Sequence, residues 1–285
     1  MMIDVGHLQA WIGRTEAREE RLSLAPVAGL TALLDHPCVL REGDPLPELA
    51  HWLYFVPTAR QSDIDVDGHP RRGGFLPPVP LPRRMWAGST IEFRLPLKIG
   101  QTVQRLQRVE SVRCKEGRSG ALVFVQVTSE YANDDGIAIV ERQDIVYRDA
   151  PAPREMPAAL NRAQTDHAWM RTVQPDPVLL FRYSALTFNS HRIHYDLPYA
   201  RDVECYPGLV VHGPLVAALL LDLLKSHRPN VRINAFTFRA VRPLFDTGAF
   251  EVCGAPADGV GHNVRLWTRD QDGATTMEAS AVLAA

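Results

Sequence analysis

The chain has 285 residues, of which 46% are apolar and 22% charged, and its formal net charge is −2. These fractions are typical of a globular protein that is long enough to bury a sizeable core. The near-neutral balance, without a basic stripe interleaved with aromatic residues, argues against nucleic acid as a partner. The four cysteines lie far apart and form no CxxC pair, so the spacing of a metal site is absent.

The chain shows neither a secretion signal nor a membrane span. Its first residues turn acidic and basic too soon for a signal peptide. The most apolar stretch, 208–224, is interrupted by His212, Pro214 and Asp222. It also falls short of the roughly 18 uninterrupted apolar residues that suggest a membrane span. We therefore expect a cytoplasmic protein that does not insert into a membrane.

The first half begins with a helical candidate and continues with strands. Apolar residues recur at mostly helical spacing in 16–34, and Pro26 is expected to break this helix into pieces. Residues 91–106 then alternate in polarity around a glycine turn. Residues 121–148 alternate again and are interrupted by Asp135-Gly136, a strong hairpin signal.

A boundary is expected after these strands. The segment 149–157 is dense in proline and charge and poor in large apolar residues, so it cannot hold a helix or a central strand. We divide the chain into a first unit at 1–150, a linker at 151–162 and a second unit at 163–285.

The second half repeats the pattern of the first. A strand is expected to end at Phe188, and a helix is expected over Pro214–Ser226, with proline in its first turn and an apolar surface nearly all round. Alternating runs follow at 236–252 and 263–284, the latter with an Asp272-Gly273 turn. The same features in the same order suggest duplication of one antiparallel unit, with an α+β fold.

Two motifs in the second half carry a resemblance to a known family. The segment YSALTFNSHRIHYD and the His212-Gly213 pair that opens the apolar helix resemble the signature of MaoC-like (R)-specific enoyl-CoA hydratases. The positions that match in the first motif are Tyr183, Ile193, His194 and Asp196. The resemblance implies a double hot-dog fold, in which two antiparallel sheets each wrap around a central helix.

The sequence also departs from the pattern of that family at three positions. Asn189 stands where the family usually has a catalytic aspartate, and His191-Arg192 replace Asn-Pro. In the first half, WIGRTEAREERL and LPRRMWAGS resemble two-hot-dog dehydratases, a branch that includes the itaconyl-CoA and mesaconyl-CoA hydratases.

The implied activity is that of a hydro-lyase, which adds water reversibly to the double bond of a short acyl-CoA. Such a reaction needs a base for water, an acid for the α carbon and donors for the thioester oxygen. His194 can exchange a proton near neutral pH. Asn189 can orient water but cannot act as a base. The amide of Gly213, at the start of the apolar helix, is expected to bind the oxyanion.

Further residues are expected to bind the substrate. Tyr183 and His212 are assigned to this role, although His212 could instead be structural. Itaconyl-CoA and mesaconyl-CoA carry a free carboxylate, which calls for an arginine in the pocket. The candidates by position are Arg83, Arg84, Arg239 and Arg242, and the phosphates of CoA could claim some of them.

We expect no cofactor and no metal, because dinucleotide and phosphate-loop motifs are absent. The expected partners are an acyl-CoA substrate and a second copy of the chain in a homodimer. Two alternatives remain open, a 3-hydroxyacyl thioester dehydratase of fatty-acid synthesis and a hot-dog thioesterase or thioester-binding protein. The first half has no counterpart of Asn189 and His194, so it is expected to complete the acyl-CoA cleft without catalysing.

Overall fold

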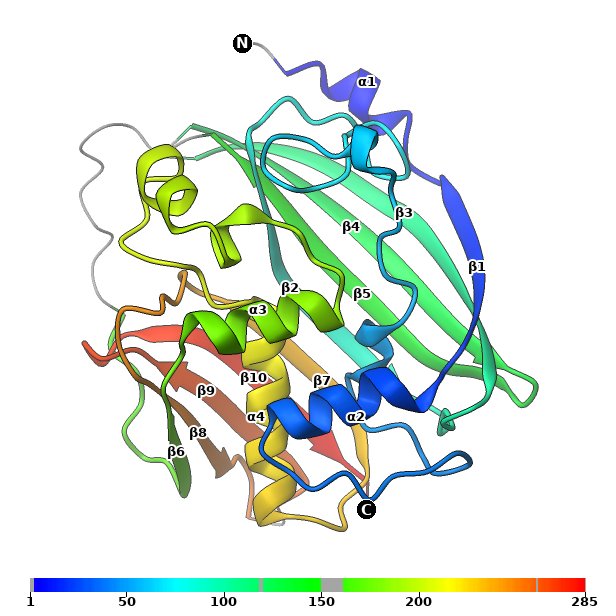
Figure 1. Ribbon diagram of the computed structural model, residues 1–285, viewed down its shortest axis with the longest axis vertical. Coiled ribbons are helices and arrows are strands. Elements are labelled where there is room, and N and C mark those ends of the chain that lie inside the picture. Colours follow the sequence, from blue (N-terminus) through cyan, green and yellow to red (C-terminus); the bar gives the residue numbers. More distant parts are fainter. Residues whose placement is uncertain (1–2, 118–119, 150–160, 260, 285) are drawn as a thin grey trace.

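The computed structural model describes residues 3–117, 120–149, 161–259 and 261–284. In this part of the chain ten strands form one antiparallel sheet in the order β1-β3-β4-β5-β2-β7-β10-β9-β8-β6 (Figure 1). The first half supplies β1 (Thr15–Arg21), β2 (Arg83–Phe93), β3 (Thr102–Gly117), β4 (Gly120–Asn133) and β5 (Gly136–Arg148). The second half supplies β6 (Trp169–Val173), β7 (Ile233–Ala240), β8 (Phe250–Pro256), β9 (Asn263–Arg269) and β10 (Thr275–Leu283).

The two halves meet at the pairing of β2 with β7. The register runs from Gly88 opposite Arg239 to Glu92 opposite Ala235. A Cβ at Gly88 would lie 2.4 Å from the carbonyl oxygen of Phe238, so the two strands approach most closely there. The sheets therefore join edge to edge, as the duplicated pattern predicts.

The helices lie on one face of this sheet (Figure 1). They are α1 (Val5–Gln9), α2 (Leu24–Leu33), α3 (Pro177–Leu186) and α4 (Gly213–His227), with short helical turns at Ala50–Leu53, Gln61–Asp63, Arg192–His194 and Tyr199–Val203. Helix α4 packs on the second half of the sheet, and nine of its residues are buried. Its bounds and burial confirm the expected apolar helix. No helix of the described residues is long and apolar enough to cross a membrane.

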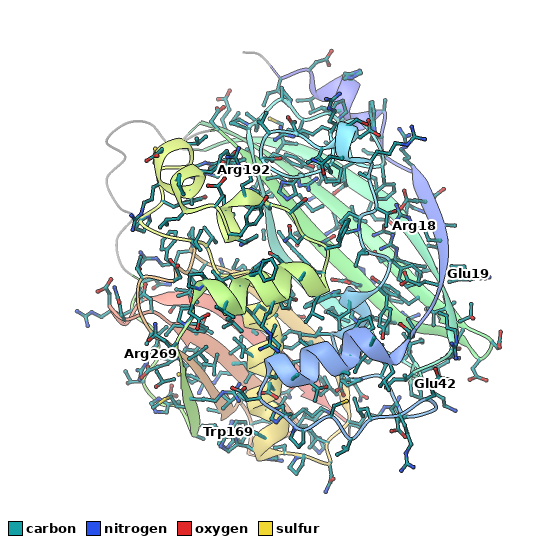
Figure 2. The ribbon with its side chains drawn as sticks, viewed as in Figure 1. Arg18, Glu19, Glu42, Trp169, Arg192 and Arg269 are labelled. Atoms are coloured by element: carbon teal, nitrogen blue, oxygen red, sulfur yellow. The ribbon has the colours of Figure 1, made fainter. Side chains whose placement is uncertain are left out.

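The helix expected over 16–34 is only partly correct. Residues Thr15–Arg21 form the edge strand β1, whose charged side chains, Arg18 and Glu19 among them, line the outer edge of the sheet (Figure 2). Charges suit an edge strand because they discourage pairing with another chain. Helix α2 begins at Leu24, so Pro26 lies in its first turn, where the missing N–H removes no helical hydrogen bond.

The strand expected to end at Phe188 is wrong, because this segment is helix α3. Asp176 caps the helix by accepting a hydrogen bond from the Leu179 amide at 2.7 Å, and Pro177 occupies the first turn. Phe188 follows in the left-handed region, with φ 47°. The Asp-Pro start signal outweighs the short alternation that suggested a strand.

The hairpin signals lie close to the observed turns. Strand β5 begins at Gly136, directly after the turn, and Gly273 lies between β9 and β10. Most of the predicted linker, 151–160, lies outside the described residues.

Because α4 fills the centre of the second half, truncating it should be costly. We expect Leu220→Ala, at a side chain that is 0% exposed, to lower the free energy of unfolding by about 2–5 kcal/mol. The matched control is Leu106→Ala on β3, which is 38% exposed and should change stability far less. Urea unfolding of both variants measures the difference, and equal losses would contradict the central place of α4.

Candidate active site

Four histidines gather where the two halves meet. His191 and His194 belong to the turn after α3, His212 precedes α4, and His69 comes from a loop of the first half. The ring centroids of His212 and His194 are 3.6 Å apart and stacked. His194 and His191 are 5.5 Å apart, and His191 and His69 are 4.0 Å apart. Ring contacts thus run from His212 to His69, and we call this set the histidine row.

His194 is oriented as a base. Its Nδ1 lies 2.7 Å from the carbonyl oxygen of Val210, which can only accept, so Nδ1 carries the proton and Nε2 keeps its lone pair. Burial lowers the pKa of His194 to about 4, and the neighbouring His69 contributes in the same direction, against the bond to Val210. The imidazole is therefore neutral at pH 7.

His212 joins α3 to the start of α4. Its Nε2 lies 2.8 Å from the hydroxyl of Ser184, and the ring of Tyr183 is 5.0 Å away. Its Nδ1 is buried and has no hydrogen-bond partner among the described residues. Burial, reinforced by His194, holds the pKa of His212 well below its ordinary value. A polar atom buried without a partner is costly, so it is a ready position for a ligand group.

Gly213 is the first residue of α4, so its N–H has no acceptor within the helix. A Cβ at this position would meet only the Met277 methyl, at 3.9 Å. Packing therefore leaves space in front of this amide. The positive end of the helix dipole favours negative charge at the same place.

Asn189 shapes the turn that holds the row. Its side-chain oxygen accepts the N–H of His191 at 3.0 Å, and its own N–H donates to Ser184 at 2.8 Å. This i to i+2 bond is a turn of the Asx type, and it orients the backbone just before the helical turn at Arg192–His194. The side-chain NH₂ of Asn189 is left as a donor that can orient water.

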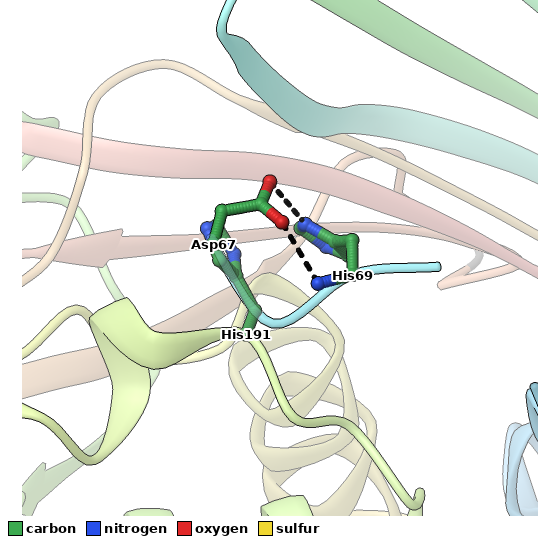
Figure 3. Close-up of side chains that lie close together, drawn as sticks. All are labelled: Asp67, His69 and His191. Atoms are coloured by element: carbon green, nitrogen blue, oxygen red, sulfur yellow. Dashed lines mark hydrogen bonds and ion pairs between the residues drawn. The ribbon is translucent and has the colours of Figure 1, made fainter. Parts of the chain in front are cut away.

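The first half contributes two side chains that the sequence did not single out. Asp67 accepts hydrogen bonds from the backbone N–H of His69 at 2.8 Å and from its ring Nδ1 at 3.0 Å (Figure 3). The ring of His191 lies against His69 on the other side. The signal for this pair is local, an aspartate-glycine turn followed at once by histidine at 67–69.

Backbone contacts fix that loop on the second half. The N–H of Arg192 donates to the Asp67 carbonyl at 2.9 Å, and the hydroxyl of Ser190 donates to the Gly68 carbonyl at 2.5 Å. Figure 2 labels Arg192 at this junction. A Cβ at Gly68 would lie 1.8 Å from the Ser190 carbonyl oxygen, and φ there is +91°. Only glycine allows this approach.

The charges around His69 decide what the row can hold. Ligand atoms of Asp67, His69 and His191 lie within 4.8 Å of one another, which is close enough for a metal ion. Burial lowers the pKa of His69 to about 4, and the positive charges of Arg84 and Arg72 act in the same direction. Two arginines beside these ligands disfavour a cation and favour an anion.

The predicted arginines are not equivalent. Arg83 forms an ion pair with Glu204, Nε to Oε2 at 2.6 Å, and is buried against Tyr206. Arg239 is exposed and paired with Glu278 at 2.8 Å, and Arg242 reaches Asp270 at 3.5 Å. Of the four, only Arg84 acts electrostatically on His69 and His191, lowering the pKa of both.

A cavity of about 500 Å³ opens beside the row, between the first-half loop and the turn at Tyr199–Val203. Asp67, which binds His69 at the end of the row, lines this cavity, and none of the four histidines does. The remaining lining includes Arg72, Arg83 and Tyr199. An acyl-CoA bound between the two halves would find room here.

Comparison with known proteins identifies the family. Residues 49–246 match the family of hydroxyacyl-thioester dehydratase type 2. The chain belongs to this family. The mesaconyl-C(4)-CoA hydratase of Chloroflexus aurantiacus is 48% identical over 96% of this chain and 97% of its own length. The mitochondrial hydroxyacyl-thioester dehydratase type 2 of Schizosaccharomyces pombe is 28% identical over 71% of this chain and 75% of its own.

The solved structures agree on the fold. A MaoC-like dehydratase from Phytophthora capsici superposes with a TM-score of 0.70 at 13% identity, covering 99% of this chain and 98% of that one. The predicted double hot-dog fold is therefore confirmed, and the family match with the 48% identical relative confirms the recognised family. So is the reaction class, because the relatives named are hydratases and dehydratases, and the chain is a hydro-lyase.

The low pKa of His194 predicts the acidic limb of the rate profile. A base is lost when it is protonated, so the wild-type hydration rate should fall only as pH drops through about 4. In Asn189→Asp the added carboxylate stabilises the imidazolium and raises its pKa, so this limb should move to higher pH. Asn189→Ala should lower the rate without such a shift. The pH–rate profiles of all three proteins on one substrate measure this, and full activity in Asn189→Ala would leave Asn189 only a turn residue.

Proposed function

We propose that this enzyme hydrates mesaconyl-CoA to citramalyl-CoA, with the thioester held between the two halves. The observation that carries the proposal is the 48% identity to a mesaconyl-C(4)-CoA hydratase over nearly the full length of both chains. The geometry supports it, because a neutral buried imidazole and a free helix amide face the same junction.

In this mechanism Nε2 of His194 takes a proton from water while the water oxygen bonds to the β carbon. Asn189 orients that water through its side-chain NH₂. Negative charge develops on the thioester oxygen, where the N–H of Gly213 and the dipole of α4 stabilise it. The imidazolium of His194 then returns the proton to the α carbon, so that one water is added across the double bond.

The neighbours of His194 prepare it for both transfers. Its contact with Val210 fixes the tautomer, so Nε2 faces the reaction in the basic form. The stacked His212 is itself held neutral by burial and adds no competing charge. Tyr183, whose pKa is raised by burial, stays protonated and packs against His212.

We expect His194→Ala to lower turnover at least ~100-fold, which is within the usual range for loss of a general acid/base. The assay follows loss of the enoyl-thioester absorbance of mesaconyl-C(4)-CoA, itaconyl-CoA and crotonyl-CoA side by side. Hydration of crotonyl-CoA alone would favour the dehydratase of fatty-acid synthesis instead. Near-normal turnover in the folded variant would exclude His194 as the base.

The oxyanion role of Gly213 has its own test. In Gly213→Ala the new methyl would stand 3.9 Å from Met277, so folding should be preserved, but the methyl would narrow the space that glycine leaves beside the N–H. We expect turnover to fall, by at most the about 10²-fold that loss of one oxyanion donor costs. Gly74→Ala, where a Cβ meets nothing within 4 Å, is the matched control. Unchanged turnover in Gly213→Ala would place the oxyanion elsewhere.

The dehydratase alternative is favoured by two observations, the family match and the relative in Schizosaccharomyces pombe. A thioesterase would need a base aimed at the thioester carbonyl, and the residues around Gly213 supply donors rather than a carboxylate.

We further propose that the enzyme works in the cytoplasm as a homodimer, with a first unit at 1–150 and a second at 163–285. Four free cysteines, at 38, 114, 205 and 253, support a reducing compartment. Exposed apolar side chains on α3, Val178 and Phe181, support association of two chains. Sedimentation of the purified protein tests the dimer.

A further inference from the structure

Mesaconyl-C(4)-CoA carries a free carboxylate that simpler enoyl thioesters lack, and its binding site has to accommodate that charge. Mesaconate is methylfumarate, so a thioester at C4 leaves a free carboxylate at C1, bonded directly to the carbon that water attacks. The double bond is trans, which places this carboxylate and the thioester at opposite ends. Burying a carboxylate requires a charged, hydrogen-bonding partner.

The histidine row has two chemically different ends. At one end His212 leads into Gly213 and α4, where the thioester oxygen is proposed to bind. His194 stacks on His212 at this end. Ring contacts then continue from His194 to His191 and from His191 to His69. A trans substrate with its thioester at the first end and its β carbon at His194 therefore directs its free carboxylate toward His69.

The side chains at that second end are poor in negative charge. Arg84 stands opposite Tyr147 in the pairing of β2 with β5, so the two side chains share a face of the sheet. The charged groups that act on the Tyr147 hydroxyl are Arg84, Arg72 and Asp67. Two positive charges and one negative charge leave an excess of one positive charge.

Of the charged side chains around the Tyr147 hydroxyl, Arg72 and Asp67 already have hydrogen-bond partners, so Arg84 is the one available to bind an anion. Arg72 donates to the Val79 carbonyl at 2.7 Å and to two further loop carbonyls. Asp67 is bound twice by His69. In the part of the chain that the structure describes, Arg84 is half-buried and has no carboxylate within ion-pair distance, unlike Arg83.

An independent observation at the same corner is the hydroxyl of Tyr147. The side chain is 0% exposed, and its hydroxyl has no acceptor among the described residues. Arg84 acts on this hydroxyl as a hydrogen-bond donor, and a guanidinium cannot accept. The buried O–H therefore lacks an acceptor, which a carboxylate would supply.

We propose that Arg84, assisted by the Tyr147 hydroxyl, binds the free C1 carboxylate of the substrate and selects dicarboxylic enoyl thioesters over simple ones. This inference rests on the proposed hydration of mesaconyl-CoA. It assigns a ligand to the first-half edge of the site and a role in specificity to the unit that lacks its own Asn-His pair.

The test compares two enzymes on two substrates. The substrates are mesaconyl-C(4)-CoA and its C1 primary amide, which keeps the shape and lacks the charge. The wild type should prefer the acid by about 10²-fold in kcat/KM. In Arg84→Met the kcat/KM for the acid should fall by this factor, and the kcat/KM for the amide should equal that of the wild type. The unchanged activity on the amide also shows that the variant is folded. Arg84→Lys should retain part of the preference, because the charge remains without the fork.

Two further variants sharpen the result. Arg142→Gln removes an exposed arginine from β5, where it pairs with Glu92 at 3.4 Å. This control should leave kcat/KM unchanged for both substrates. Tyr147→Phe should raise KM for the acid about tenfold and leave the amide unchanged.

The outcomes distinguish failure of the proposed hydration of mesaconyl-CoA from failure of the carboxylate site alone. A wild type that does not hydrate mesaconyl-C(4)-CoA under any condition overturns the proposed function. A wild type that hydrates the acid and the amide equally well overturns the carboxylate site alone, without recourse to a variant. An Arg84→Met enzyme that loses the same factor on both substrates also overturns it, since Arg84 would then bind a phosphate of CoA or support the fold.

Discussion

The pairing of β2 with β7 is the contact on which the rest of the molecule depends. It turns two five-stranded halves into one sheet and removes a free edge from each. Residues from both halves, such as Ile91 and Phe236, then share one hydrophobic core with α4. The same pairing sets Gly68 against Ser190, which are 122 residues apart in the chain. The site is a consequence of that seam.

Burial of uncharged imidazoles is the second constraint. Burial lowers the pKa of both His194 and His212, and neighbouring histidines add to it, His69 at His194 and His194 with His191 at His212. A neutral base at pH 7 follows from this arrangement without a carboxylate beside it. Asn189 fits such a site, because it holds the turn and adds no charge. The carboxylate that is present, Asp67, lies at the far end and is engaged by His69.

Much of the fold could be predicted because it depends on local patterns. The apolar run of α4 with its flanking prolines, the alternating strands and the aspartate-glycine turns each reflect a periodicity or a turn preference that acts over few residues. The errors were local too. Charged alternation at Thr15–Arg21 read as a helix, and the Asp176-Pro177 cap of α3 was overlooked. In both places a short run of residues fits the helical period as well as the strand period. Only strand pairing at Thr15–Arg21 and helix capping at Asp176 decide which structure forms.

The sequence by itself determined the reaction class, through the family resemblance, and it predicts Asn189, His194 and Gly213 as site residues, since they lie on one continuous motif and the helix after it. It could not rank the arginines. Arg83 and Arg84 are adjacent in the chain, yet one is neutralised by Glu204 and the other acts on the charge of His69. Nor could it place Asp67 and His69, whose partners come from the other half. Charge and contact across the seam depend on distance in space, so only the tertiary structure decided them.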